Sequence, residues 1–496
     1  MYVQSKKISP WTGKDYVRII LYFLANYVLL GGLFVAAIFF NCDVSPEKFV
    51  NYFGSENGLN QFLYLMLASF LILVVLFLFY FFEDRDFIKK PKNVIMMFSI
   101  IYVSLIISYC IGKWGSIYAR PIALCALLSL LLINRQTAIF MNITMCMIMF
   151  LLDKYTGATY LQHYANAEFS ALLIGFSAGL IGIYLVSGVN SRIKVFFMGF
   201  VKTVPIIISM FVLEGMNIKQ IPETLLTGIS AGILSVSFEM VLLPLFELLF
   251  NALTDYRLSE LTDHKNKLLK KLIELAPGTF NHSLIVANLA ESCASAIGES
   301  SQIARAAAYY HDIGKIVNPA FFTENQQGSS PHDELPPELS AQIIIRHTSD
   351  GKKILKRNRL PRIIEDIAVE HHGTMPVRFF YVKASKMTDG EIDIKDFSYP
   401  GPKPQSKIAA IIMIADGCEA KVRTLKDRSH ANVDRAIKEI IEERMDMEQF
   451  TDCDITLRDL DIIRNTLVNT LAGVYHDRVV YPKLKIGQKV KIKVNE

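Results

Sequence analysis

The sequence lacks the features of a secreted or nucleic-acid-binding protein. Its seven cysteines, at positions 42, 110, 125, 146, 293, 418 and 453, form no Cys-x-x-Cys pair. Only Cys42 is expected to face outside, so no disulfide framework is predicted. The net charge of +5 is small for 496 residues, which gives no reason to expect a nucleic acid polymer as a partner.

Charge is also scarce. Charged residues make up 20% of the chain against 52% apolar residues, and the mean hydropathy is +0.31. Soluble proteins rarely reach that value, so a membrane protein is predicted. The apolar excess fills residues 17–250, in runs at about 17–41, 59–82, 94–111, 121–134, 138–152, 168–190, 195–213 and 222–250. A helix needs ~20 residues to cross a bilayer. Because the runs 121–134 and 138–152 are short, we predict eight spans with seven as the alternative.

The basic residues predict the orientation of these spans. The first run is expected to be a signal anchor, because it is long and no convincing cleavage site follows it. With the N-terminus inside, ten basic residues fall inside and five outside. The inside set is Lys6, Lys7, Lys14, Arg85, Lys89, Lys90, Lys92, Arg135, Arg192 and Lys194, and the outside set is Lys48, Lys113, Arg120, Lys154 and Lys219. This asymmetry predicts that everything after residue 250 is cytoplasmic.

Four regions are predicted, in an all-α protein. They are a membrane bundle of about eight helices (1–250), a connector helix (251–276), a soluble domain (277–481) and a basic tail (482–496). The connector has an apolar stripe and a basic face, which fits either a solvated helix near anionic headgroups or a rigid link to the membrane. Within the spans, Lys202, Glu239 and Glu247 are functional candidates. They also fit side chains that face the bundle interior or are paired near its surface.

Five of the ten histidines and two aspartates form an ordered series in the soluble half. The series is His282, His311, Asp312, His347, His371, His372 and Asp416. A lone histidine on an apolar face is usually structural, but Asp416 follows the apolar Ile411-Ile-Met-Ile-Ala and would be buried there. Burying an unpaired carboxylate costs several kcal/mol. A bound metal ion would offset this cost, so Asp416 is a candidate metal ligand.

Several motifs carry a resemblance. Tyr310-His-Asp-Ile-Gly-Lys315, Glu370-His-His-Gly373 and Ile414-Ala-Asp416 match the HD phosphohydrolase superfamily in order and type. Glu274-Leu-Ala-Pro-Gly-Thr, Tyr399-Pro-Gly-Pro-Lys-Pro-Gln-Ser-Lys407 and the preceding bundle resemble the 7TM-HD family of bacterial cyclic-di-AMP phosphodiesterases. That family usually has a large extracellular domain after its first span, where this chain has only about 17 residues.

The resemblance implies a multi-pass protein of the bacterial cytoplasmic membrane that hydrolyses cyclic-di-AMP, a second messenger, to linear pApA. It implies two divalent metal ions, with Fe or Mn expected from the imidazole and carboxylate ligands. Asp312 would bridge the ions, with His282, His311 and Asp416 completing one site and His347, His371 and His372 the other. Lys315 would neutralise charge on the phosphate, or else satisfy a helix C-terminus. Tyr399 and Lys403 are further candidates for substrate contact.

Other interpretations stay open. The site also fits an HD phosphohydrolase acting on another nucleotide, a non-catalytic nucleotide-binding receptor, or a regulatory domain on a transporter. His372-Gly-Thr-Met lacks the Gly-Tyr-Pro signature of the cyclic-di-GMP branch, which argues against that substrate. The aromatic residues of 373–404 fit either stacking on adenine or a small core of their own. A homodimer is a further candidate assembly.

Overall fold

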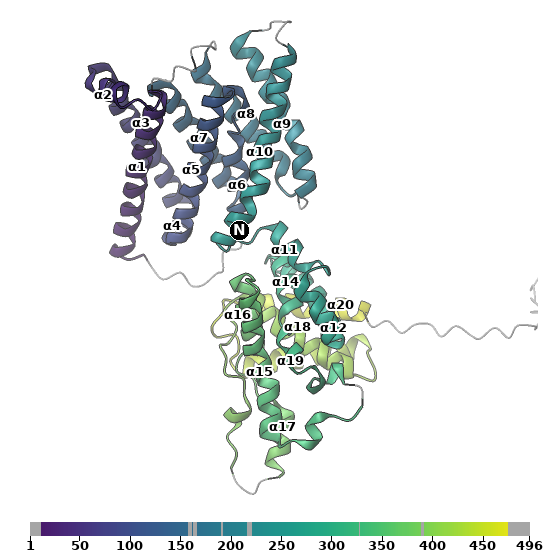
Figure 1. Ribbon diagram of the computed structural model, residues 1–496. Helices are drawn as coiled ribbons and strands as arrows, with labels where there is room; N and C mark the ends of the chain where they lie inside the picture. The colour runs from purple at the N-terminus through teal and green to yellow at the C-terminus, as the bar shows by residue number, and fades with distance from the viewer. Residues whose placement is uncertain are drawn as a thin grey trace, which may run out of the picture. The chain divides into compact units, whose positions relative to one another are not determined.

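The structure is a computed structural model that describes residues 11–156, 161, 166–189, 192–215, 221–326, 328–387 and 391–474 (Figure 1). The chain divides into a membrane unit, residues 1–267 with 359–362, and an HD unit, residues 268–358 and 363–496. Apart from one isolated bridge between Pro376 and Ser398, the described residues form no β-structure. The predicted all-α class is therefore confirmed.

Seven helices in the described part of the membrane unit are long and apolar enough to cross a membrane. They are α1 (Gly13–Asn41), α3 (Glu56–Glu83), α5 (Pro91–Trp114), α7 (Arg135–Tyr155), α8 (Ser170–Val186), which η3 (Ala167–Phe169) precedes, α9 (Arg192–Glu214) and α10 (Ile221–Leu249). The shorter helices are α2 (Pro46–Gly54), α4 (Arg85–Lys89), η1 (Ile117–Ala119) and α6 (Ala123–Leu132). The long helices expose many apolar side chains, such as Leu67 on α3 and Val212 on α9. Exposed apolar side chains of this kind suit contact with lipid.

The expectation of eight full spans needs correction. The run 121–134 forms only the ten-residue helix α6, about 15 Å long, which is half of the ~30 Å hydrocarbon core. Gly115 ends α5, and Pro121 stands just before α6, where a proline lacks the N–H that a longer helix would use. Most α6 side chains are buried inside the unit, which suits a short helix whose preceding backbone, residues 115–122, is not α-helical. The alternative of seven spanning helices fits the structure.

The short segment nevertheless carries the chain back to the end of the unit from which α5 started. Aromatic contacts join Trp11 to Phe81 and Phe79 to Phe140. One cavity of about 310 Å³ is lined by residues from 130–135, 186–189 and 253–256. The start of α1, the α3–α5 turn and the exit of α10 therefore share one end of the membrane unit. The same grouping of segments was predicted from the basic residues.

Ionisable side chains in this unit are buried in different ways. Lys202 and Glu239 are buried between the long helices, as an in-span position requires. Glu247 near the end of α10 accepts a hydrogen bond from Thr254 and lies 3.6 Å from Arg192, so it is paired near the surface. Arg120, expected in an outside loop, is buried against Asp153 at the end of α7. Between α1 and α3 the chain forms only a turn and α2, and no further domain is folded there.

The connector is not the single helix that we expected. α10 ends at Leu249, and two short helices follow, α11 (Asp255–Thr262) and α12 (Lys267–Leu275). Asn251 adopts a positive φ of 40°, and Thr254 accepts the backbone N–H of Arg257 as the N-cap of α11. A residue in the left-handed region and a fresh N-cap both interrupt a continuing helix.

The HD unit is built around one buried helix, α18 (Lys407–Thr424), whose residues 408–415 are all buried. α13 (Pro277–Ala296) packs against α14 (Ser301–Tyr310), α18 and α20 (Leu457–Val474). The remaining elements are α15 (Pro337–Arg357), α16 (Arg362–Glu370), α17 (Arg378–Ser385), α19 (His430–Asp446), η5 (Ile313–Val317), η6 (Pro319–Phe321), η7 (Thr323–Asn325), η8 (Pro331–Glu334) and η9 (Ile394–Phe397). The predicted basic tail, 482–496, and the expected domain end at 481 lie outside the described residues.

Candidate metal centre

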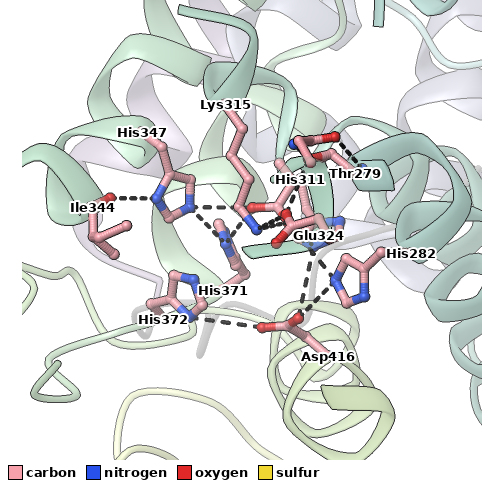
Figure 2. Close-up of polar contacts among 12 residues, drawn as sticks. Thr279, His282, His311, Lys315, Glu324, Ile344, His347, His371, His372 and Asp416 are labelled. Carbon is pink, nitrogen blue, oxygen red and sulfur yellow. Dashed lines mark hydrogen bonds and ion pairs between the residues drawn. The ribbon is translucent and has the colours of Figure 1, made fainter. Parts of the chain in front are cut away.

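Five elements of the HD unit bring the predicted series together (Figure 2). His282 lies on α13, His347 on α15 and Asp416 on α18. His311 and Asp312 follow the end of α14, and His371 and His372 follow the end of α16. Gly314 allows this approach, because a Cβ there would lie 1.9 Å from the His347 carbonyl oxygen. The glycine of the His-Asp-Ile-Gly motif thus lets η5 pack directly on α15.

The seven side chains form two groups. Within each group, the possible ligand atoms all lie within 4.8 Å of one another. One group holds Asp312, His347, His371 and His372, and the other holds His282, His311 and Asp416. All but His372 and Asp416 are buried.

Asp312 lies between the two groups and turns one oxygen toward each. Its Oδ1 lies 3.2 Å from His347 Nε2 and 3.7 Å from His371 Nε2. Its Oδ2 lies 3.3 Å from His311 Nε2 and 3.7 Å from His282 Nε2. This is the arrangement that a carboxylate bridging two cations requires.

Backbone carbonyls define the proton positions of three histidines. The Nδ1 atoms of His311, His347 and His371 lie 2.6, 2.6 and 3.1 Å from the carbonyl oxygens of Ala308, Ile344 and Ala368. A carbonyl can only accept, so each Nδ1 carries the proton and each Nε2 presents its lone pair. The Nε2 of His311 has no hydrogen-bond partner among the described residues. Metal-ligating histidines are oriented in this way, so the residues present fit a metal centre.

The electrostatics of the cluster also suit cations. Burial lowers the pKa of His371 to about 4, so its ring is neutral at pH 7 and able to donate a lone pair. Burial opposes ionisation of Asp312, but Lys315 and His311 hold the pKa of this carboxyl well below its usual range. For His282, burial favours the neutral ring, yet hydrogen bonds to Asp416 and Glu419 raise its pKa to about 10. Carboxylates that hold a proton on this ring would equally favour a metal ion in its place.

Lys315 lies beside the cluster and contacts two carboxylates. Its Nζ is 2.7 Å from Asp312 Oδ2 and 2.8 Å from Glu324 Oε1, which also accepts a hydrogen bond from Thr279. Burial opposes the charge on Lys315, but Asp312 and Glu324 raise the pKa of its ammonium, which therefore stays protonated. Sequence reasoning missed Glu324, because nothing in its surroundings along the chain distinguishes it from a surface glutamate.

A second missed residue is Glu419, whose side chain is fully buried. Its Oε2 lies 2.6 Å from Nδ1 of His282. A signal did exist in the sequence, since Glu419 follows Asp416 by three residues and so faces the same side of α18.

The two predicted substrate contacts differ in their surroundings. The Tyr399 ring stacks on His372 at 4.4 Å between centroids, beside the metal-ligand cluster. The Lys403 ammonium instead contacts Thr451 Oγ1 at 3.3 Å and Glu448 at 3.8 Å. Among the aromatic residues of 373–404, Phe380 and Phe397 are buried in a small core with Ala341 and Ala384, while Phe379 is exposed. The small-core interpretation thus holds for part of this segment.

Comparisons with known proteins agree with this arrangement. Residues 279–421 match the HD domain, and residues 60–254 match the family described as a 7TM receptor with intracellular HD hydrolase. The chain belongs to this family of membrane-anchored HD-domain proteins. The resemblance stated from the motifs is confirmed.

Two curated relatives are named cyclic-di-AMP phosphodiesterase PgpH. The protein from Bacillus subtilis is 35% identical over 452 residues, covering 86% of this chain and 61% of the relative. The protein from Listeria monocytogenes is 37% identical over 430 residues, covering 82% of this chain and 57% of the relative. The chain spans about three fifths of the length of these relatives.

A solved structure of the Listeria monocytogenes PgpH HD domain is 49% identical to this chain. The match covers 43% of this chain and 100% of the solved chain, and its TM-score is 0.41. A second structure of that domain, described as a complex with cyclic-di-AMP, has the same identity and TM-score.

Proposed function

We propose that this protein is a membrane phosphodiesterase that hydrolyses cyclic-di-AMP to linear pApA at a two-metal centre. One observation carries the hydrolase assignment: the two oxygens of buried Asp312 are divided between two groups of histidine and carboxylate side chains. The names of the relatives, cyclic-di-AMP phosphodiesterase, support the choice of substrate. The missing Gly-Tyr-Pro signature after His372 argues against cyclic-di-GMP.

The ligand set supports Fe or Mn as the metals. Five imidazoles and two carboxylates suit first-row transition metals better than Mg²⁺ or Ca²⁺, which prefer oxygen ligands. A pair of such ions supplies an activated water nucleophile and a clamp for the phosphate oxygens. The chain's own contribution is to hold these ligands together, most of them buried. Lys315 adds a fixed positive charge beside Asp312, where it would oppose the negative charge that develops on the phosphate.

The substrate assignment is tested with the purified full-length protein in detergent, loaded with Mn²⁺ or Fe²⁺. We expect pApA as the product from cyclic-di-AMP and a higher kcat/KM than with cyclic-di-GMP. A site that hydrogen-bonds the amino group of adenine leaves polar groups unpaired against the carbonyl of guanine, which discriminates strongly. Equal rates, or a preference for cyclic-di-GMP, would refute the substrate while leaving a metal hydrolase in place.

We further propose that the protein lies in the bacterial cytoplasmic membrane, with its N-terminus and its HD unit in the cytoplasm. The ten-to-five basic asymmetry supports this orientation. The shared end of the α1 start and the α10 exit supports the same compartment for both. A reporter fusion after Lys90, just before α5, should read inside, and one after Ser55, just before α3, should read outside. The same compartment for both fusions would overturn the orientation.

A further inference from the structure

The histidines of the cluster differ in the partner of the ring nitrogen, Nδ1, that faces away from the centre. His311, His347 and His371 each donate from Nδ1 to a backbone carbonyl, which is a neutral acceptor. His282 alone among these four places its Nδ1 against a carboxylate, Glu419, at 2.6 Å. A carboxylate partner fixes the tautomer and makes the imidazole a stronger donor than a carbonyl partner does.

The same difference makes the two halves of the centre unequal in charge. The half with His282 and His311 contains Asp416 and is backed by Glu419, while the half with His347, His371 and His372 contains three imidazole rings and no carboxylate other than Asp312. Asp312 is shared between them. Two additional carboxylates within or directly behind one half attract a divalent cation strongly at the low dielectric of a buried site.

A competing contact does not cancel this effect. Arg423 lies 3.6 Å from Glu419 Oε1, but its side chain is 44% exposed to solvent. The other oxygen, Oε2, faces His282, and Glu419 itself is completely buried. Glu419 therefore directs its charge at the ring, and water screens the guanidinium.

We propose that Glu419 is a positioning residue that makes the His282–His311–Asp416 half the tighter of two unequal metal sites. The first ion occupies this half, and the His347–His371–His372 half holds the second, more easily exchanged ion. This inference rests on the two-metal centre of the proposed function, and it adds an order of filling and the residue responsible for it.

The test is a metal titration of the full-length protein in detergent, which needs no substrate. Metal-free protein is titrated with Mn²⁺ against a chromophoric chelator, and the bound ion is followed by electron paramagnetic resonance. Wild-type protein should bind two ions in two separate steps. Glu419→Gln should weaken the tighter step by roughly 10–100-fold, the usual effect of removing such a partner, and leave the weaker step unchanged.

Two further variants make the test specific. His347→Ala should remove the weaker step and keep the tighter one, which is the reverse of Glu419→Gln. Glu439→Gln serves as the matched control, because this glutamate on α19 is paired with Lys421 at the surface, and it should change neither step. Melting of the metal-free proteins measures any general loss of folding.

The outcomes separate the possible failures. Two unchanged steps in Glu419→Gln would overturn the positioning role, and so would equal weakening of both, which a general structural role predicts. Loss of the tighter step in His347→Ala would overturn the order of filling. If wild-type protein binds two ions in this order but does not cleave cyclic-di-AMP, the substrate proposal fails and the present inference stands.

Discussion

The two units of this chain both bury charged side chains, and one buried group from each unit shows a different way of accommodating charge. In the membrane unit, the fully buried Arg120 forms a two-bond pair with Asp153. In the HD unit, several buried ring nitrogens converge on Asp312, and the Nε2 of His311, 3.3 Å from Asp312 Oδ2, makes no hydrogen bond within the part of the chain that the structure describes. A buried group that the protein itself satisfies is structural, whereas converging groups that it leaves unsatisfied point to a ligand.

The membrane pair explains how the short segment between α5 and α6 is held inside the bundle. Arg120 lies in the segment between α5 and α6, and its partner lies on α7. Gly112 of α5 makes room for the guanidinium, since a Cβ there would lie 2.1 Å from Nε. The pair therefore fixes the segment 115–122 against two long helices.

The largest expected effect comes from removing Asp312, the residue at the centre of the predicted metal-ligand cluster in the HD unit. Asp312→Ala removes the carboxylate that faces both groups, so we expect loss of most bound metal and a fall in turnover of roughly 10³-fold or more, several kcal/mol of transition-state stabilisation. Metal content and pApA formation are the measurements. His430→Ala, at the exposed start of α19, should change neither. Asp312→Ala protein that turns over normally would end the two-metal hypothesis.

The sequence predicted the metal-ligand cluster better than the supporting contacts. All seven predicted ligands lie together, although His282 and Asp416 are 134 residues apart, because a family motif records the residues that meet in space. Glu324 and Glu419 belong to no such motif. Each makes a contact between segments far apart in the chain, Glu419 with His282 and Glu324 with Thr279. Helical spacing places Glu419 on the same face as Asp416, but composition and periodicity do not identify the partner of either residue.

The second prediction sharpens the structural side of the comparison. Arg120→Met leaves the Asp153 carboxylate buried without its partner, which typically costs about 3–5 kcal/mol. The melting temperature of the full-length protein in detergent should fall accordingly. The double variant Arg120→Met with Asp153→Leu should recover most of the loss, because well-packed apolar residues often replace a buried pair without cost. A single variant as stable as wild type would show that the pair does not hold the segment.

Hydropathy located the membrane helices, but it did not show how α6 and the connector are built. The run 121–134 has the composition of a span, and only its length of ten helical residues sets it apart. Arg120 was expected in a loop because a window of residues carries no information about a partner 33 positions away. The break at Asn251–Thr254 depends on one left-handed residue and one N-cap. The apolar pattern continues on both sides of this break, so it predicts one continuous helix.

The smallest effect concerns a charge pair at the surface of the HD unit. Water solvates both side chains there, so neither charge depends on a protein partner or a ligand. Arg464 donates to both oxygens of Asp434, at 2.8 and 2.6 Å, with each side chain about one-third exposed. Exposed pairs of this kind contribute about 0.2–1 kcal/mol. Arg464→Gln should therefore lower the melting temperature by only a few degrees at pH 7, and by less in high salt.

The pH dependence of this small effect identifies its origin. The hydrogen bond from Arg464 lowers the pKa of Asp434 below its usual value. A carboxyl with a lowered folded-state pKa stabilises the fold above the unfolded value of about 3.9 and loses that contribution as the pH falls through the folded value. The difference between wild type and Arg464→Gln should thus be constant from pH 7 to about 5 and shrink only below about 4. A difference that instead disappeared near pH 6 would implicate a histidine, and the surface pair would then not be its source.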